Sequence, residues 1–310
     1  MIYVGTAGWS YPQGEGKWDG IFYPTDRRLD RLAYYAERFQ AVEVNSTFYR
    51  PPDPAITRAW VRKTPADFRF TAKLYQKFTH PKMYEEATGD VAALRASDFE
   101  QYKRGIAPLA EAGKLGALLA QFPPSFKADE ETLTLLEDLL RQFQDYPLAV
   151  ELRHRSWSEE PRAAALLREY NAAWCWIDEP KFRSSIGAVP LTSRLGYLRF
   201  HGRNAVQWWK GDRETRYDYL YSPGEQAALA AEVRAVAEHA VDTYVFYNNH
   251  YRAKAVANAV QLKAALGQPL GAPLAPSMLA AYPELAALQP GGQLPLGEEA
   301  TSDDRRGRPS

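Results

Sequence analysis

Short β-rich runs recur along the chain, and most are separated by a stretch with helical character. We expect strands at residues 2–5, 41–46, 68–73, 115–121, 148–153, 173–178, 196–201 and 243–248. Runs such as LGALLA and YVFY are almost continuously apolar, which is typical of strands that are buried on both faces. Since helices normally cover such strands, this pattern favours an α/β architecture.

Helix-start signals lie between the expected strands. Asp53 and Asp129 each precede a helical run, and the first of these runs has proline at its opening position. Ser222 opens a capping box that Glu225 completes, again with proline at the first helical position. Residues 253–266 continue the helical pattern after the last strand.

Eight strands alternating with helices predict a single (β/α)8 TIM-like barrel over residues 1–266. The alternative is an open doubly wound sheet, which normally carries a G-x-G-x-x-G turn after its first strand. The corresponding segment here, GTAGWSYPQGEGKW, lacks that spacing. Residues 267–310 are rich in Pro, Gly and Ala, and we expect a largely disordered extension with one short helix at 277–288.

Three connections are longer than the others and all follow strands. They cover residues 9–27, 74–114 and 202–221. In a barrel, the connections that follow strands meet at the C-terminal face, where active sites are built. These long loops therefore direct attention to that face.

Charge and cysteine content restrict the setting of the protein. The 38 Lys and Arg balance the 38 Asp and Glu, so there is no basic excess of the kind that broad nucleic-acid binding requires. Cys175 is the single cysteine, which excludes an internal disulfide and favours the cytoplasm. We expect no signal peptide and no membrane association, and the sequence carries no signal for an oligomeric state.

Polar residues gather at the carboxyl ends of at least six expected strands, while the strand middles stay apolar. They are Glu43, Asn45, Lys73, Gln121, Glu151, Arg153, Asp178, Arg199, His201 and Asn248. Burying a charge without a partner costs free energy, so charged residues at these positions are not expected to arise by chance. Either the residues line the mouth of a binding site, or they form a salt-bridge lattice that plugs the barrel; we favour the binding site.

The mixture of charges suits a small ligand with anionic and hydroxyl groups. Arginine recognises phosphate or carboxylate, and carboxylates bind hydroxyls or transfer protons. We expect Glu43 and Glu151 to act as acid and base, with His201 as an auxiliary group, as in a hydrolase or isomerase. The expected ligand contacts are Asn45, Lys73, Gln121, Arg153, Asp178, Arg199, Arg203, Asn248 and Trp208.

Two further chemistries remain open at this stage. Glu43, Glu151, Asp178 and His201 are a conceivable divalent-metal set, but the neighbouring cations oppose it, so we predict no metal or other cofactor. Lys73 stands at a strand end where a Schiff-base nucleophile is permitted, provided that its pKa is depressed. Binding of an anion is the simpler role for this lysine.

The seventh loop supports a different function. Between residues 202 and 221 it interleaves Arg203, Lys210, Arg213 and Arg216 with tryptophans and tyrosines. Bases stack on such rings while cations follow the backbone, so single-stranded or damaged nucleic acid is an alternative ligand. A non-catalytic sensor on a barrel scaffold is a third hypothesis.

Several motifs together resemble the YecE-like family, known as domain of unknown function 72. They are GTAGWSY, FYP at 22–24, VEVNSTFYRPP at 42–52, FRFTAK at 68–73, QFPPSF at 121–126, ELRHRSW at 151–157, YLRFHGR at 197–203 and YVFYNNHYRAKAVANA at 244–259. The resemblance spans residues 2 to 266 and implies a single TIM-like barrel. It marks most of the strand-end polar residues, but it implies no reaction.

Overall fold

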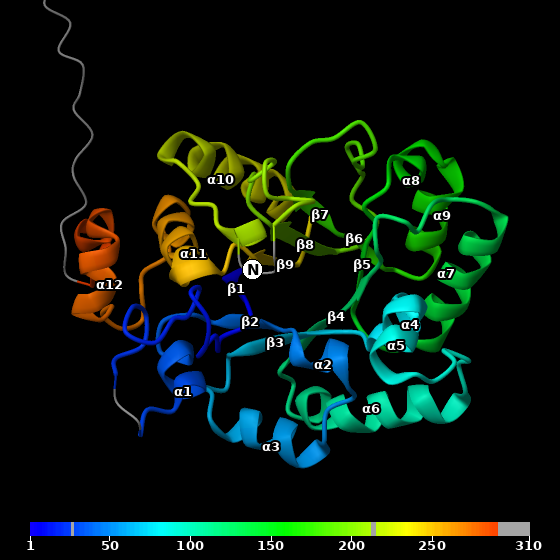
Figure 1. The fold of residues 1–310 in the computed structure, drawn as a ribbon, viewed down its shortest axis with the longest axis horizontal. Coiled ribbons are helices and arrows are strands. Elements are labelled where there is room, and N and C mark those ends of the chain that lie inside the picture. Colours follow the sequence, from blue (N-terminus) through cyan, green and yellow to red (C-terminus); the bar gives the residue numbers. More distant parts are fainter. Residues whose placement is uncertain (26–27, 212–214, 291–310) are drawn as a thin grey trace, which may run out of the picture.

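The computed structural model describes residues 1–25, 28–211 and 215–290. These residues form one parallel sheet with the strand order β6-β5-β4-β3-β2-β1-β9-β8-β7, surrounded by helices (Figure 1). The strands are β1 (Ile2–Ala7), β2 (Ala41–Val44), β3 (Arg69–Lys73), β4 (Leu115–Gln121), β5 (Leu148–Glu151), β6 (Ala173–Trp174), β7 (Trp176–Asp178), β8 (Leu195–Phe200) and β9 (Asp242–Tyr247). The predicted TIM-like barrel is confirmed.

The predicted sixth strand is divided at Cys175. Its first part, β6, pairs with β5, and its second part, β7, pairs with β8, so the chain itself closes the barrel. The amide of Trp174 donates to Thr192 Oγ1 at 2.8 Å, and that hydroxyl donates to the carbonyl of Ala172 at 2.6 Å. Thr192 therefore satisfies backbone groups that would otherwise continue the strand pairing.

Helices cover the outside of the barrel (Figure 1). The longer ones are α3 (Pro54–Arg62), α5 (Pro81–Thr88), α6 (Ala96–Glu111), α7 (Glu130–Gln142), α9 (Pro161–Glu169), α10 (Pro223–Ala237) and α11 (Lys254–Ala265). The shorter ones are α1 (Arg31–Ala36), α2 (Ser46–Tyr49), α4 (Gln76–Thr79), α8 (Arg155–Glu159) and α12 (Pro276–Ala281). No helix within the described ranges combines the length and apolar character needed to span a bilayer.

The predicted helix starts are confirmed by their caps. The Asp53 carboxylate accepts from the Ala55 amide at 2.7 Å, and Asp129 caps α7 in the same way. Ser222 and Glu225 form the predicted reciprocal capping box at the start of α10. Side-chain oxygens satisfy amides at these helix ends that have no partner within the helix.

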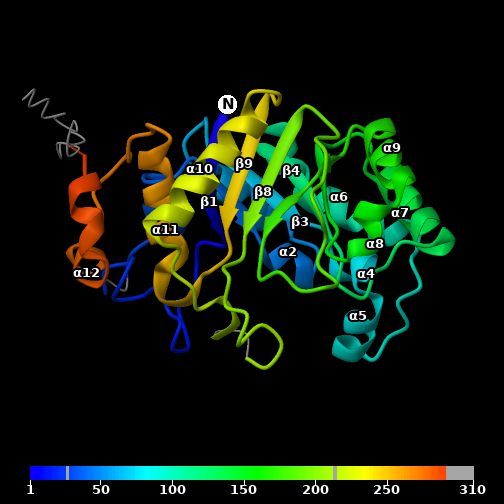
Figure 2. The ribbon, with the colours of Figure 1, turned by 90° about the horizontal axis from the view of Figure 1, so that it is seen from above.

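The parallel strands point to one face of the molecule. In Figure 2, β8 and β9 run in the same direction, toward the edge where α5 and the loop after β8 lie. The connections after β1, β3 and β8 all leave the strands on this side, because every strand pair is parallel. The long loops thus surround the carboxyl end of the barrel.

Part of the C-terminal extension is folded. Met278 and Leu285 are fully buried, and Figure 1 shows α12 on the outer side of α11. The Ser277 hydroxyl donates to the Ile21 carbonyl at 2.7 Å, and Tyr282 donates to Arg252 at 2.6 Å. The short helix expected at 277–288 is present as α12 and the 3-10 helix Pro283–Leu288, and the chain before it also buries apolar side chains, at Leu270 and Leu274. Residues 291–310 lie outside the described residues.

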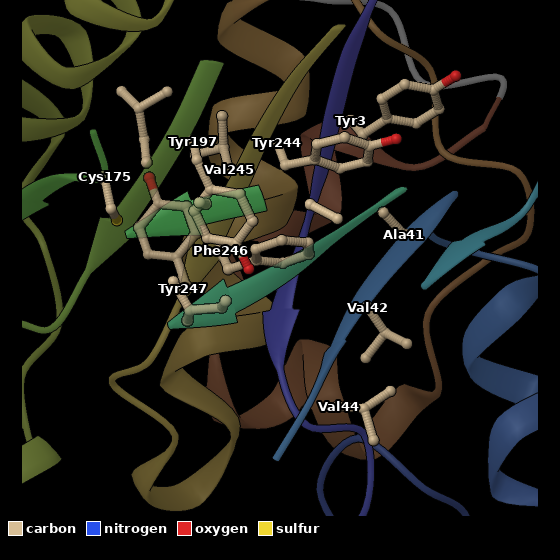
Figure 3. Packing of buried hydrophobic residues seen from close by; sticks show 14 of the residues in the cluster. Tyr3, Ala41, Val42, Val44, Cys175, Tyr197, Tyr244, Val245, Phe246 and Tyr247 are labelled. Carbon is tan, nitrogen blue, oxygen red and sulfur yellow. The ribbon is translucent and has the colours of Figure 1, made fainter. Parts of the chain in front are cut away.

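Aromatic rings fill the lower part of the barrel interior. Tyr3 and Tyr244 stack with ring centres 4.9 Å apart near the amino ends of their strands, and the ring of Tyr197, the register partner of Tyr244, lies 5.6 Å from that of Phe246 (Figure 3). A Cβ atom at Gly116 on β4 would lie 2.5 Å from the Tyr244 ring, so this glycine makes room for it. The barrel is therefore packed below its polar end.

We predict that Gly116→Ala lowers the free energy of unfolding by about 1–3 kcal/mol, because the added methyl group overpacks the interior against Tyr244. Gly224→Ala in the first turn of α10 is the control, since its Cβ would meet nothing within 4 Å. Urea denaturation of both variants measures the difference. An equal effect at the two positions would contradict the close packing around Tyr244.

Candidate functional site at the barrel mouth

Arg199 lies at the centre of the polar end of the barrel and is only 1% exposed. Its Nε donates to Glu43 Oε2 at 2.9 Å, and its Nη2 donates to Glu43 Oε1 at 2.7 Å. Its Nη1 donates to Glu151 Oε2. The three residues come from β8, β2 and β5, so one guanidinium joins three strands across the interior through charge-assisted hydrogen bonds.

Tyr197 supports this centre from below. It shares a strand face with Arg199, two residues further on, and its hydroxyl donates to Glu43 Oε2 at 2.8 Å. The same hydroxyl lies 2.9 Å from Thr71 Oγ1 on β3. The sequence analysis did not select Tyr197, although its phase with Arg199 was a usable signal.

Arg153 forms a second layer above Glu151. Its Nε donates to Glu151 Oε1 at 2.6 Å, and its Nη2 lies 3.2 Å from His201 Nε2. Because a guanidinium has no acceptor, Nε2 of His201 must accept and the ring is neutral. Burial and the Arg153 charge lower the pKa of His201 to about 3, in agreement with this arrangement. Asn248 Nδ2 lies 3.0 Å from the other ring nitrogen.

The charges of the two arginines determine the state of Glu151. Burial by itself would raise the pKa of this carboxyl, but Arg153, Arg199 and His201 together lower it well below its usual range. Burial would likewise lower the pKa of Arg199, but Glu151 and Glu43 raise it well above its usual range. Glu151 and Arg199 are therefore fixed charges at neutral pH.

Glu179 is a site residue that the sequence analysis missed. It follows β7 directly, is 5% exposed, and places Oε2 3.5 Å from Arg153 Nη1. That oxygen accepts no hydrogen bond from the described residues. Burial raises the pKa of the Glu179 carboxyl, and Arg153 offsets only part of this effect. The available signal was its position one residue after Asp178, at the end of a strand.

Asp178 and Arg203 form a separate pair at the rim. Arg203 Nε donates to Asp178 Oδ2 at 2.9 Å, and Nη2 donates to Oδ1 at 2.8 Å. Tyr221 donates to the same carboxylate at 2.7 Å, and Arg203 also contacts Glu225 at 3.1 Å. Because they bind each other at two points, these two predicted ligand contacts have most of their hydrogen-bonding capacity already used.

Lys73 stands at the end of β3 with its Nζ 4.4 Å from the centre of the Phe48 ring. Burial and the neighbouring Arg199 lower the pKa of Lys73 to about 7. His80 lies beside it; burial and the charges of Lys73 and Arg153 lower the pKa of His80 to about 4. Among the lysine and arginine side chains at the mouth, Lys73 thus loses its proton most readily.

The predicted amides lie around the same centre. Gln121 Oε1 is 3.5 Å from Arg199 Nη1. Asn45 is half-buried at the start of α2, where its side chain caps no helix amide. With Asn248 on His201, these side chains come from three different strand ends. The structure therefore brings all three predicted amides to the barrel mouth.

A chain of aromatic rings covers one side of the mouth. Trp208 is buried with its ring centre 6.4 Å from His201 and 6.2 Å from Tyr217. Tyr217 lies 5.1 Å from His250, which stacks on Tyr11 at 4.4 Å. These rings reach from the loop after β1 to the loop after β8. They provide flat apolar surface next to the charged cluster.

The arrangement does not match a metal centre. Within residues 1–25, 28–211 and 215–290, no three His, Cys, Asp or Glu side chains are grouped as ligands. Glu43, Glu151 and Asp178 are each bound by an arginine. A cation would have to displace these pairs before it could bind.

Comparison with known proteins supports the family and the fold. A family described as "Protein of unknown function DUF72" matches residues 3–280. The chain belongs to the DUF72 family. The UPF0759 protein YunF of Bacillus subtilis is 31% identical over 276 residues, which cover 84% of this chain and 93% of YunF. YecE of Escherichia coli K12 is 31% identical over 157 residues, about half of each chain.

Solved DUF72 structures share the barrel. The protein from Thermotoga maritima is 37% identical with a TM-score of 0.74, and the match covers 86% of this chain and all of that chain. The protein from Enterococcus faecalis is 28% identical with a TM-score of 0.75, covering 86% and 96% of the two chains. These likenesses establish the family and the fold, and the chemistry has to be argued from the site.

We predict that Arg199→Met lowers the free energy of unfolding by about 3–5 kcal/mol at pH 7, because the buried Glu43 loses its cation and Glu151 keeps only Arg153. Arg162→Met is the matched control, since Arg162 pairs with Glu130 and Glu160 at the surface, where solvent screens the charges; its effect on stability should be far smaller. Urea denaturation measures both values.

The pH dependence provides a second check. In the wild type the folded-state pKa of Glu151 is depressed, so stability is lost only as the pH falls below the usual carboxyl pKa. Without Arg199, protonation of the buried carboxyls stabilises the folded variant as the pH falls. The deficit should therefore shrink from pH 7 to pH 5, and a constant deficit would contradict the ion-pair account.

Proposed function

We propose that the barrel mouth binds a small polyhydroxylated ligand carrying a phosphate or carboxylate, in the cytoplasm, and transforms it by acid–base chemistry of the hydrolase or isomerase type. One observation carries this proposal. Glu179 Oε2 is buried without a hydrogen-bond donor, 3.5 Å from Arg153 Nη1. A ligand hydroxyl can donate to this oxygen while an anionic ligand oxygen accepts from Arg153.

The carboxylates divide into two roles. Burial raises the pKa of Glu179, so this carboxyl takes up a proton more readily than an ordinary carboxyl does, which suits a proton-transfer group. Glu151 has a depressed pKa and two arginine partners, so it remains a carboxylate that positions Arg153 and Arg199. We therefore assign proton transfer to Glu179 and positioning to Glu43 and Glu151. His201, held neutral, positions Arg153.

The surroundings suit the hydroxyl-bearing part of the ligand. Asn45, Gln121 and Asn248 offer amide donors and acceptors, and Tyr11, Tyr217 and Trp208 offer rings on which the apolar face of a sugar can stack. Lys73 adds an amine at the end of β3. Together these groups match a phosphorylated or acidic sugar.

A second candidate function is binding of single-stranded nucleic acid, which one observation favours. Trp209 is 60% exposed, and its ring centre lies 5.5 Å from that of Phe182. Phe182 lines a shallow surface hollow with Arg155 and Arg183. Exposed rings beside arginines can stack bases and bind phosphates. Of the loop cations that suggested this function, Arg203 is paired with Asp178, and Arg213 lies outside the described residues.

Thermal denaturation with added ligands tests the proposal. We predict that glucose 6-phosphate or gluconate stabilises the protein and that glucose does not; a ligand at a hundred times its dissociation constant adds about 2.7 kcal/mol. Arg153→Gln should abolish the shift. Arg155→Gln, a surface arginine paired with Glu159, should preserve it. Glu179→Gln should preserve binding and abolish any conversion of the ligand followed by NMR.

Two results would contradict the proposal. Equal stabilisation by glucose and glucose 6-phosphate would show that Arg153 does not bind an anionic group of the ligand. Stabilisation only by a single-stranded oligonucleotide, lost in Trp209→Ala, would favour the second candidate function.

A further inference from the structure

Lys73 is half-buried at the end of β3 and, unlike the buried lysines, has no acceptor in the described part of the chain. Lys77 donates to Asp98 at 2.9 Å, and Lys263 donates to Gln40 at 3.0 Å. Lys114 donates to two backbone carbonyls and one hydroxyl, at 2.7–3.0 Å. Among the described residues, Lys73 Nζ makes no hydrogen bond and no ion pair, and its contact is the face of Phe48. Its position at the barrel mouth therefore requires an explanation.

The backbone of Lys73 is held firmly. Its carbonyl accepts from the Thr47 hydroxyl at 2.7 Å and from the Tyr102 hydroxyl at 2.8 Å. Both donors come from outside β3, so the strand end that carries the lysine is fixed. An amine on a rigid strand end is positioned better than one on a loop.

The neighbouring carboxylates do not neutralise Lys73. Glu43 and Glu151 are bound to Arg199, and Glu151 is also bound to Arg153. Burial and the Arg199 charge lower the pKa of Lys73 to about 7, so a large share of the amine is unprotonated at neutral pH. Unprotonated amine is the form that attacks a carbonyl carbon.

We propose that Lys73 Nζ is a nucleophile that forms an imine with an aldehyde or ketone carbon of the ligand at the barrel mouth. The inference rests on the proposed function and narrows its ligand to an anionic carbonyl compound. Arg153, with the free Glu179 oxygen beside it, holds the anionic and hydroxyl end, and the carbonyl end meets Lys73.

The step balances without a further reactant. The nitrogen lone pair forms a bond to the carbonyl carbon, and the carbonyl oxygen takes a proton to give a carbinolamine. The carbon–oxygen bond then breaks, and the two amine hydrogens leave with the oxygen as water. The product is a carbon–nitrogen double bond on Lys73, which withdraws electrons from the adjacent carbon and eases loss of a proton there.

Reductive trapping with glyoxylate, a small anionic aldehyde, tests the inference on the wild-type protein. Sodium cyanoborohydride reduces the imine to a stable secondary amine, and peptide mass spectrometry locates it. We predict labelling of Lys73 at pH 7 at least about tenfold faster than of the exposed Lys82, because far more of its amine is unprotonated. Lys114 and Lys263, buried and hydrogen-bonded, should stay unlabelled.

Four comparisons separate this inference from the proposed function. Lys73 labelling no faster than that of Lys82 would overturn the inference. Thermal stabilisation by glyoxylate without labelling of Lys73 would also overturn the inference, but it would support the proposed anion site. Glycolaldehyde, which lacks the charge, should label Lys73 more slowly; equal labelling by both aldehydes would support the nucleophile and overturn the anion site. A Lys73→Arg variant should lose the label and keep the stabilisation.

Discussion

The buried guanidinium of Arg199 is the interaction on which the polar end of the barrel depends. It binds Glu43 at two atoms and Glu151 at a third, and so connects β8 with β2 and β5. Three charges at 0–1% exposure are tolerable only because each has a partner. Tyr197, in the aromatic layer beneath, donates a hydrogen bond to Glu43 and so helps to position this carboxylate along the barrel axis.

This pairing separates fixed charges from groups that can change their protonation. Glu151 and Arg199 stay ionised because each holds the other, whereas the pKa of Glu179 is raised and that of Lys73 is lowered to about 7. The sequence left a salt-bridge lattice and a binding site as alternatives; the structure contains the lattice, and the binding site that we propose lies directly beside it. The lattice consumes the carboxylates that would otherwise neutralise Lys73. A barrel fold hosts many reactions, so these groups, rather than the fold, carry the functional argument.

The sequence was sufficient for the barrel and for the inward side of its strands, because period-two alternation places Glu43, Lys73 and Arg199 without knowledge of any contact. The sequence could not supply the ion pairs among these residues, because they depend on which strands face each other across the closed barrel. The break at Cys175 was missed because Thr192, which accepts from the Trp174 amide there, lies in a remote loop. Glu179 was missed because it follows its strand, where alternation no longer applies.

The most direct test of this account is the titration of Lys73 by NMR, using protein labelled with 13C at the lysine ε position and a Lys73→Arg variant for assignment. We predict a midpoint of about 7, because Arg199 holds both nearby carboxylates and leaves this amine without a counter-ion. A midpoint near the ordinary lysine value of about 10.4 would contradict the account. It would mean that the charges at the mouth are neutralised in another way.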